Sequence, residues 1–99
     1  MKIEFADPKL AVIRTDRAAA ELRLPIGVIK SCREKLLVIE AARDERVLRN
    51  WQALRYKKLK GDRDGQCEVR LNEQYRIVFV LDESQTPPIF RILEIGDIH

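Results

Sequence analysis

Two arginines in the C-terminal half of the chain, Arg70 and Arg76, stand on either side of a short polar stretch in the segment LRYKKLKGDRDGQCEVRLNEQYRIVF. A basic run, RYKKLK, precedes them, and residues 53–60 contain four basic side chains and no acidic one. Guanidinium forks and ammonium groups bind phosphate oxygens through charge-assisted hydrogen bonds. The segment therefore predicts a surface for an anion, and the phosphate backbone of a nucleic acid is the leading candidate.

The alternation of side chains predicts how these arginines face each other. Apolar or aromatic residues occupy the odd positions 67, 69, 71, 75, 77, 79 and 81, so these positions should share the core face of a β-hairpin. Opposite residues of a hairpin point to the same face, which pairs Leu71 with Tyr75 around a loop of residues 72–74. This register places Arg70 opposite Arg76 on the other face of the hairpin.

Two like charges in opposite positions destabilise a sheet by up to about 1 kcal/mol, so a neighbouring group should offset their repulsion. A bound phosphate is one candidate. The alternative is an ordinary solvated surface on which Glu68, Glu94 or water separates the two guanidinium groups. The hairpin pattern leaves both interpretations open.

The lysines of the basic run have two interpretations as well. Strand alternation sends Lys58 and Lys60 to one face of the sheet and Lys57 to the other. Lysines on a short edge strand also protect a sheet against aggregation, so their presence does not by itself require a ligand.

Three helices are predicted before the hairpin. Asp7 and Pro8 fit the N-cap and first position of a helix that extends to about residue 22. A second helix, with Pro25 in its first turn, extends to about residue 42, and Asp44 can cap a short third helix. The second helix carries one apolar stripe at steps of three and four: Ile29, Cys32, Leu36 and Ile39.

Strands are predicted on both sides of these helices. The stretch KIEF at residues 2–5 is β-prone, and residues 67–71, 75–81 and 89–95 follow a period of two or form a short apolar run. The predicted fold is therefore α+β, with an N-terminal strand and two to three helices packed on a three- to four-stranded antiparallel sheet. Trp51, the single tryptophan, is assigned a packing role, with base stacking as the alternative.

Composition limits the function classes. The chain of 99 residues predicts one domain over residues 1–99, and its formal charge of +3 suits an acidic partner. No signal-peptide core or membrane-length apolar run is found, so a cytoplasmic protein that does not enter a membrane is expected. Cys32 and Cys67 are interpreted as packed side chains, and two cysteines with one histidine do not make a standard zinc site. No metal or other cofactor is predicted.

The segment LKGDRDGQCEVRLNEQYRIVF, with the closing GDIH, resembles the HigB branch of the RelE/ParE toxin superfamily. The family pattern is roughly His-Pro-Leu-Lys-Gly, then Gly-x-aromatic-Ser-Ile-Arg-Val-Asn, then aromatic-Arg-Ile-x-Phe, with a closing Asp-Tyr-His. The resemblance implies the toxin of a type II toxin–antitoxin pair, a ribosome-dependent endoribonuclease that cuts messenger RNA by metal-free attack of the 2′-hydroxyl. It also implies a HigA-like helix-turn-helix antitoxin as partner, and contact with operator DNA only through the antitoxin complex. Exposed apolar positions on the first two helices are the expected antitoxin surface.

The resemblance also assigns roles to individual residues. Arg76 matches the phosphate-stabilising arginine, Lys60 the lysine of Leu-Lys-Gly, and His99 the terminal histidine, for which proton donor is the expected role. Lys57 falls where many relatives have a histidine, and Lys57 or Lys60 is the expected base. The residues expected to catalyse cleavage are Lys57, Lys60, Arg76 and His99. The residues expected to bind RNA are Arg55, Lys58, Arg63 and Arg70.

Three positions depart from the family pattern. Lys57 replaces the histidine, Ile98 replaces the penultimate tyrosine, and Cys67 replaces the aromatic residue after Gly-Gln. These departures favour a second class of function, in which a member of the superfamily without nuclease activity binds a protein such as DNA gyrase or acts with its antitoxin only in operon control. The retained Lys60, Arg70, Arg76 and His99 favour the nuclease.

Overall fold

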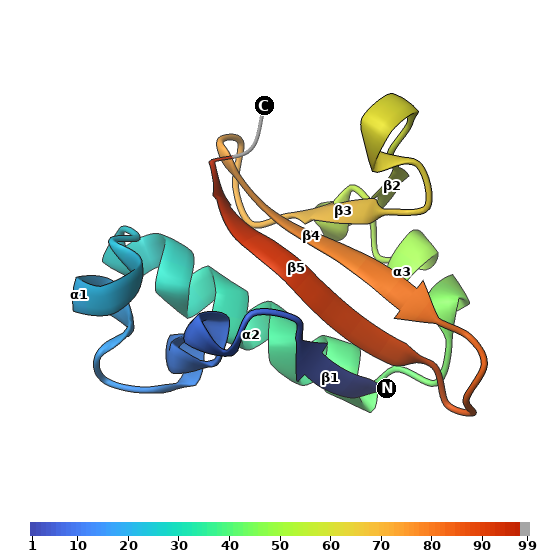
Figure 1. Cartoon of the computed structure of the whole chain (residues 1–99), viewed down its shortest axis with the longest axis horizontal. Helices are drawn as coiled ribbons and strands as arrows, with labels where there is room; N and C mark the ends of the chain where they lie inside the picture. Colours follow the sequence, from blue (N-terminus) through green and yellow to red (C-terminus); the bar gives the residue numbers. More distant parts are fainter. Residues whose placement is uncertain (98–99) are drawn as a thin grey trace.

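Helix α2, Ile26–Ala41, packs on one face of a five-stranded sheet in the computed structural model, which describes residues 1–97 (Figure 1). The strand order across the sheet is β1-β5-β4-β3-β2. Strand β1 is parallel to β5, and the other neighbours are antiparallel. The strands are β1 Lys2–Phe5, β2 Lys57–Lys58, β3 Cys67–Arg70, β4 Tyr75–Asp82 and β5 Ile89–Asp97. The predicted α+β class is confirmed, and the N-terminal strand joins the antiparallel strands as a fifth, parallel member.

The helix predicted from residue 8 to about residue 22 is in fact two shorter elements, a 3-10 helix η1 at Pro8–Arg14 and helix α1 at Ala18–Leu22. The predicted cap at Asp7 is confirmed, because its carboxylate accepts a hydrogen bond from the Lys9 N–H at 3.0 Å. The break falls at Thr15, whose backbone is extended and whose hydroxyl donates to the Val12 carbonyl oxygen at 2.9 Å. A threonine side chain that bonds to nearby backbone competes with helix continuation, which explains the interruption.

The apolar stripe of α2 faces the sheet, as predicted. Its four members, Ile29, Cys32, Leu36 and Ile39, are each at most 5% exposed. Burial raises the pKa of the Cys32 thiol to about 12, so this cysteine is an inert packed side chain at neutral pH. Pro25 is the N-cap residue immediately before α2 and does not lie in its first turn.

Helix α3, Glu45–Asn50, begins at the predicted cap, since the Asp44 carboxylate accepts a hydrogen bond from the Arg46 N–H at 2.9 Å. Two short 3-10 helices follow on the way to the hairpin, η2 at Gln52–Leu54 and η3 at Gly61–Arg63. Gly61 and Gly65 have positive φ angles of 66° and 88°, conformations that glycine adopts without steric cost.

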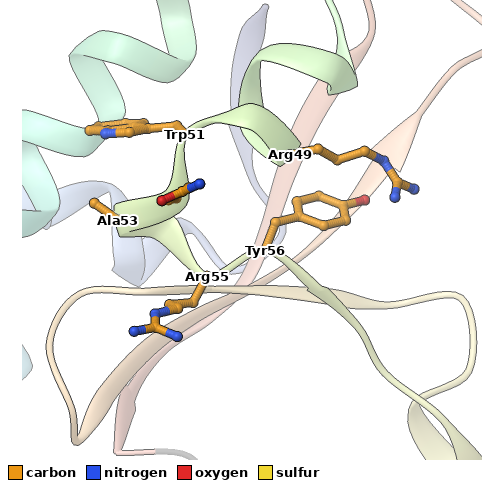
Figure 2. A pocket seen from close by; sticks show the side chains of 6 residues that line it. Arg49, Trp51, Ala53, Arg55 and Tyr56 are labelled. Atoms are coloured by element: carbon orange, nitrogen blue, oxygen red, sulfur yellow. The ribbon is translucent and has the colours of Figure 1, made fainter.

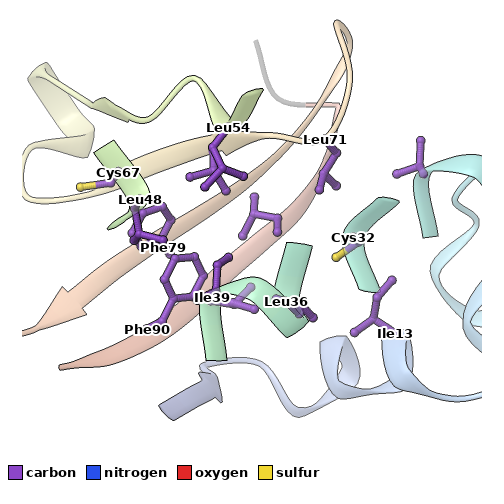
Figure 3. Packing of buried hydrophobic residues seen from close by; sticks show 14 of the residues in the cluster. Ile13, Cys32, Leu36, Ile39, Leu48, Leu54, Cys67, Leu71, Phe79 and Phe90 are labelled. Atoms are coloured by element: carbon purple, nitrogen blue, oxygen red, sulfur yellow. The ribbon is translucent and has the colours of Figure 1, made fainter. Parts of the chain in front are cut away.

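The hairpin of β3 and β4 has the predicted register. Val69 pairs with Ile77 and Arg70 with Arg76, and the Leu71 N–H donates to the Tyr75 carbonyl oxygen at 2.9 Å. The odd-numbered side chains of the hairpin enter the core, where Phe79 stacks on Phe90 of β5 with ring centroids 4.0 Å apart (Figure 3). The hairpin therefore presents its core face to the helices and leaves Arg70 and Arg76 on the opposite, outer face.

Among residues 1–97, no helix combines the length and the apolar character that crossing a membrane would require.

Candidate functional site

Arg76 is held in place by the turn of its own hairpin. Its Nη1 donates to the carbonyl oxygens of Asn72 at 2.6 Å and Tyr75 at 3.1 Å. Its Nε lies 3.9 Å from Glu68 Oε1, and the two side chains are only 14% and 17% exposed. The guanidinium group is therefore oriented by neutral acceptors on one side and balanced by a carboxylate on the other.

Arg70, the residue opposite Arg76, has no such partners within residues 1–97. It makes no ion pair there, and its Nε is buried without a hydrogen-bond partner. Buried polar atoms are normally paired, and an arginine without a counter-charge favours a nearby anion. Glu68 therefore lies beside Arg76, as one of the two interpretations expected, whereas the binding of a phosphate at Arg70 stays a prediction.

Glu68, one of the groups expected from the sequence to separate the two arginines, lies beside Arg76 in the structure. It pairs in register with Lys57 of β2 and with Val78 of β4, so one cross-strand row joins Lys57, Glu68 and Val78 on the outer face. The family pattern has serine at this position. Its spacing of two residues from Arg70 predicts a shared face, but its pairing with Lys57 could not be predicted because β2 contains only two residues. Glu94, which also faces Val78, pairs with Arg63 instead.

The remaining basic residues expected at the site are divided between two faces. Lys57 shares the outer face with the arginines, as its pairing with Glu68 requires. Lys58 pairs with Cys67, so it belongs to the core side, where it lines a cavity of about 300 Å³ with Tyr56 and Glu83. Lys60 is exposed at the residue before η3.

Arg63 is bound by other side chains of the chain. Its Nη2 lies 3.1 Å from the Glu94 carboxylate, and its Nη1 donates to Gln66 Oε1 at 3.2 Å. His99 and Ile98, the expected proton donor and the replaced tyrosine position, lie outside the described residues. The structure therefore brings Lys57, Glu68, Arg70 and Arg76 together, separates Lys58 from them, and engages Arg63 elsewhere.

A larger cavity, of about 480 Å³, is lined by Arg49 of α3, by residues of η2 and by the residues that flank η2 (Figure 2). The Arg49 guanidinium lies 5.1 Å from the centre of the Tyr56 ring and forms an ion pair with Glu45. Burial and a hydrogen bond with Cys67 raise the pKa of the Tyr56 hydroxyl, so that it stays protonated at physiological pH. Arg55, at the mouth of the cavity, is exposed and makes no ion pair within residues 1–97.

The site on the outer face has the charges needed to bind and polarise a phosphodiester. Two guanidinium groups can hold nonbridging oxygens and stabilise the charge that develops on them, although arginine does not transfer protons. A carboxylate and an ammonium group in the next row, from Glu68 and Lys57, are groups that can exchange a proton.

Comparisons with known proteins identify the family of this chain. Residues 4–90 match the sequence model of a family described as the RelE-like toxin of type II toxin–antitoxin system HigB. Toxin HigB-1 of Vibrio cholerae serotype O1 is 33% identical over 79 residues, which cover 80% of this chain and 82% of the relative.

Two solved structures share the fold. A YoeB/ParE toxin from Agrobacterium tumefaciens superposes with a TM-score of 0.57 at 15% identity, over 100% of both chains. The YoeB–YefM complex from Staphylococcus aureus gives a TM-score of 0.57 at 16% identity, over 100% of this chain and 98% of that one. The family match and the HigB-1 relative confirm the resemblance found in the sequence: the chain belongs to the RelE-like HigB toxins of type II toxin–antitoxin systems.

Proposed function

We propose that this toxin is an endoribonuclease that cuts messenger RNA on the ribosome, with Arg70 and Arg76 holding the phosphate at the bond that breaks. The observation that carries the proposal is the cross-strand pair itself, in which Arg76 is oriented by the hairpin turn and Arg70 has no counter-charge within residues 1–97. Like charges at such a position are unfavourable without an anion, and a phosphodiester supplies one.

The reaction follows from the groups near that phosphate. The 2′-oxygen loses its proton and attacks the adjacent phosphorus, the bond from phosphorus to the 5′-oxygen breaks, and the leaving oxygen takes up a proton. Arg76 stabilises the charge of the phosphorane. Lys57 or Lys60, or the neighbouring Glu68, accepts the first proton, and His99 supplies the second. The products are a 2′,3′-cyclic phosphate and a 5′-hydroxyl. The ribosome positions the message and thereby contributes to the rate.

The proposed partner is a HigA-like antitoxin with a helix-turn-helix domain, which carries the complex to operator DNA. Helix α2 supports a protein contact on its outer side, because Ile26 is 77% exposed, Leu37 69% and Val38 40%. Neighbouring exposed apolar side chains of this size are typical of protein-binding surfaces.

The proposal is tested by inducing this chain in cells, once by itself and once together with the neighbouring antitoxin reading frame. Each experiment compares wild type with Arg76→Ala. Removing the guanidinium should abolish growth arrest and lower mRNA cleavage by about a hundredfold or more. Because Arg76 also bonds to the turn, Arg76→Lys keeps the charge and separates loss of phosphate recognition from loss of fold. Arg23→Ala, an exposed arginine on α1's C-cap, is the matched control and should remain toxic.

Mapping of RNA ends after brief induction identifies the target. New ends within translated messages are the expected result. Full toxicity of a folded Arg76→Ala variant would place the site elsewhere, and arrest with intact messages and broken DNA would favour a gyrase-directed toxin.

A further inference from the structure

The cavity at η2 is lined by groups that can bind a nucleotide. Its volume of about 480 Å³ is in the range of small-ligand pockets. It is lined by two arginines, two aromatic rings, one amide and one alanine; no acidic side chain of residues 1–97 lines it, although Glu45 pairs with Arg49. The lining residues are Arg49, Trp51, Gln52, Ala53, Arg55 and Tyr56 (Figure 2). Aromatic faces stack on bases, and arginines bind phosphates, so this lining suits a nucleotide better than an apolar or cationic ligand.

Arg55 lines this cavity and makes no ion pair within residues 1–97. Its backbone has φ 50° and ψ 47°, in the left-handed region, between the fully buried Leu54 and the half-buried Tyr56. These neighbours thus fix the position of the Arg55 Cα atom. The Arg55 side chain is exposed and has no carboxylate partner within residues 1–97. Arg23 shares the left-handed conformation, so Arg55 is distinguished by its position at the cavity and not by its backbone.

The rings of the cavity are held firmly. Tyr56 contacts Phe79 edge to face with ring centroids 5.9 Å apart, and the Arg49 guanidinium covers it at 5.1 Å. Trp51 packs partly against the core and is half-buried, and its indole extends to the opposite side of the segment from Tyr56 and Arg49 (Figure 2). A rigid, partly exposed aromatic surface stacks on a base without the entropic cost of ordering the side chain.

The cavity is adjacent to the outer face of the hairpin. In the antiparallel pair of β2 and β3, Lys57 lies opposite Glu68, so the chain before β2 approaches the Arg70 end of β3. Helix η2, which immediately precedes Arg55, also contacts β3. An RNA strand whose phosphate lies at Arg70 and Arg76 therefore passes close to Arg55.

From this placement we propose that the cavity of Arg49, Trp51, Gln52, Arg55 and Tyr56 is a subsite for a neighbouring nucleotide of the RNA, with the base on Trp51 and the phosphate on Arg55. The inference rests on the proposed nuclease function for the identity of the strand. Stacking accepts every base, so this subsite adds affinity with little base preference.

The test uses Trp51 as its own reporter, because it is the only tryptophan in the 99 residues. The purified toxin is titrated with a 2′-O-methyl RNA hexamer, which lacks the attacking hydroxyl and stays intact. Stacking on the indole should give saturable quenching of its emission. Tripolyphosphate, which carries the charge without bases, should give little quenching.

The decisive variants are Arg55→Gly and, as matched control, Arg23→Gly. Both variants replace an exposed arginine whose backbone is in the left-handed region, with φ 50° at Arg55 and 54° at Arg23. Glycine adopts this region without steric cost, so both variants should fold. Arg55→Gly should weaken hexamer binding by about tenfold. Arg23→Gly removes the same charge and should change it by less than about twofold.

The outcomes separate this inference from the nuclease proposal. Quenching that depends on Arg55 supports the subsite, even if the toxin cuts no message in cells, a result that would overturn the nuclease alone. Absent quenching in a preparation that cuts messages overturns the subsite alone. Equal loss in the two glycine variants, or equal quenching by tripolyphosphate, also overturns it, since binding would then depend on overall charge.

Discussion

Glu68 decides how two arginines can share one face of the hairpin. It is mostly buried, lies 3.9 Å from the Arg76 guanidinium, and stands in the row next to the Arg70–Arg76 pair. A carboxylate at this place lowers the repulsion between the arginines and leaves a net positive charge for a phosphate. It also gives the site a second group that can accept a proton beside Lys57.

A double-mutant cycle measures this contact. Glu68→Gln and Arg76→Gln should show a coupling of about 1 kcal/mol in the free energy of unfolding, because the pair is only 17% and 14% exposed. The control is the exposed pair of Arg17 and Glu21, at 70% and 47% exposure, for which about 0.3 kcal/mol is expected. Urea denaturation of the single and double variants gives both values, and equal couplings would contradict the account.

Among the elements, the β3–β4 turn fixes both the register of the hairpin and the position of the Arg76 side chain. Asn72 Oδ1 accepts hydrogen bonds from the N–H groups of Gln74 at 2.8 Å and Tyr75 at 2.7 Å. The carbonyl oxygen of the same residue accepts from Arg76. The turn that sets the register therefore also orients the guanidinium group.

Asn72→Ala should lower the free energy of unfolding by about 1 kcal/mol, because two backbone donors lose their acceptor. It should also reduce mRNA cleavage, since the Asn72 carbonyl that anchors Arg76 is no longer fixed. Glu73→Ala, at the exposed neighbouring position, should leave both quantities unchanged. Thermal denaturation and mapping of RNA ends check the two effects, and a fully stable, fully active Asn72→Ala variant would disprove this role of the turn.

In the whole molecule, α2 buries one face in the core and exposes apolar side chains on the other. Its inner stripe closes the core against the sheet, where the hairpin and β5 supply Phe79 and Phe90 (Figures 1 and 3). Its outer side carries apolar residues that no described residue covers, and the proposed antitoxin is the natural occupant. We therefore expect stability and antitoxin binding to depend on different residues of this helix.

Two adjacent leucines test this division. Leu36 is 2% exposed and Leu37 69%. Leu36→Ala should lower the free energy of unfolding by about 2–5 kcal/mol, because it leaves a cavity in the core. Leu37→Ala should change it by less than about 0.5 kcal/mol but weaken antitoxin binding. Calorimetry of unfolding and titration with the antitoxin check both; a large loss of stability in Leu37→Ala would refute the division.

Much of the architecture was predictable because it depends on local repetition. The period of two in residues 67–81 determined which side chains face the core, and with it the pairing of Arg70 and Arg76. The steps of three and four in α2 determined its buried stripe, and Asp7 and Asp44 were recognisable as caps from residue type and position. Each of these features involves residues that are close in the sequence.

The tertiary structure alone decided the features that join distant segments. The parallel pairing of β1 with β5, the approach of Lys57 to Glu68, the capture of Arg63 by Glu94, and the cavity at Arg55 all depend on strand order and packing. The break at Thr15 is local, since its hydroxyl donates to the Val12 carbonyl oxygen, but residue type alone does not show that this bond forms. Side-chain periodicity does not show which segments far apart in the sequence become neighbours, because that choice minimises the free energy of the whole core. The arginine pair was therefore predictable from the sequence, whereas the pairing of Glu68 with Lys57 and the cavity at Arg55 follow from the fold.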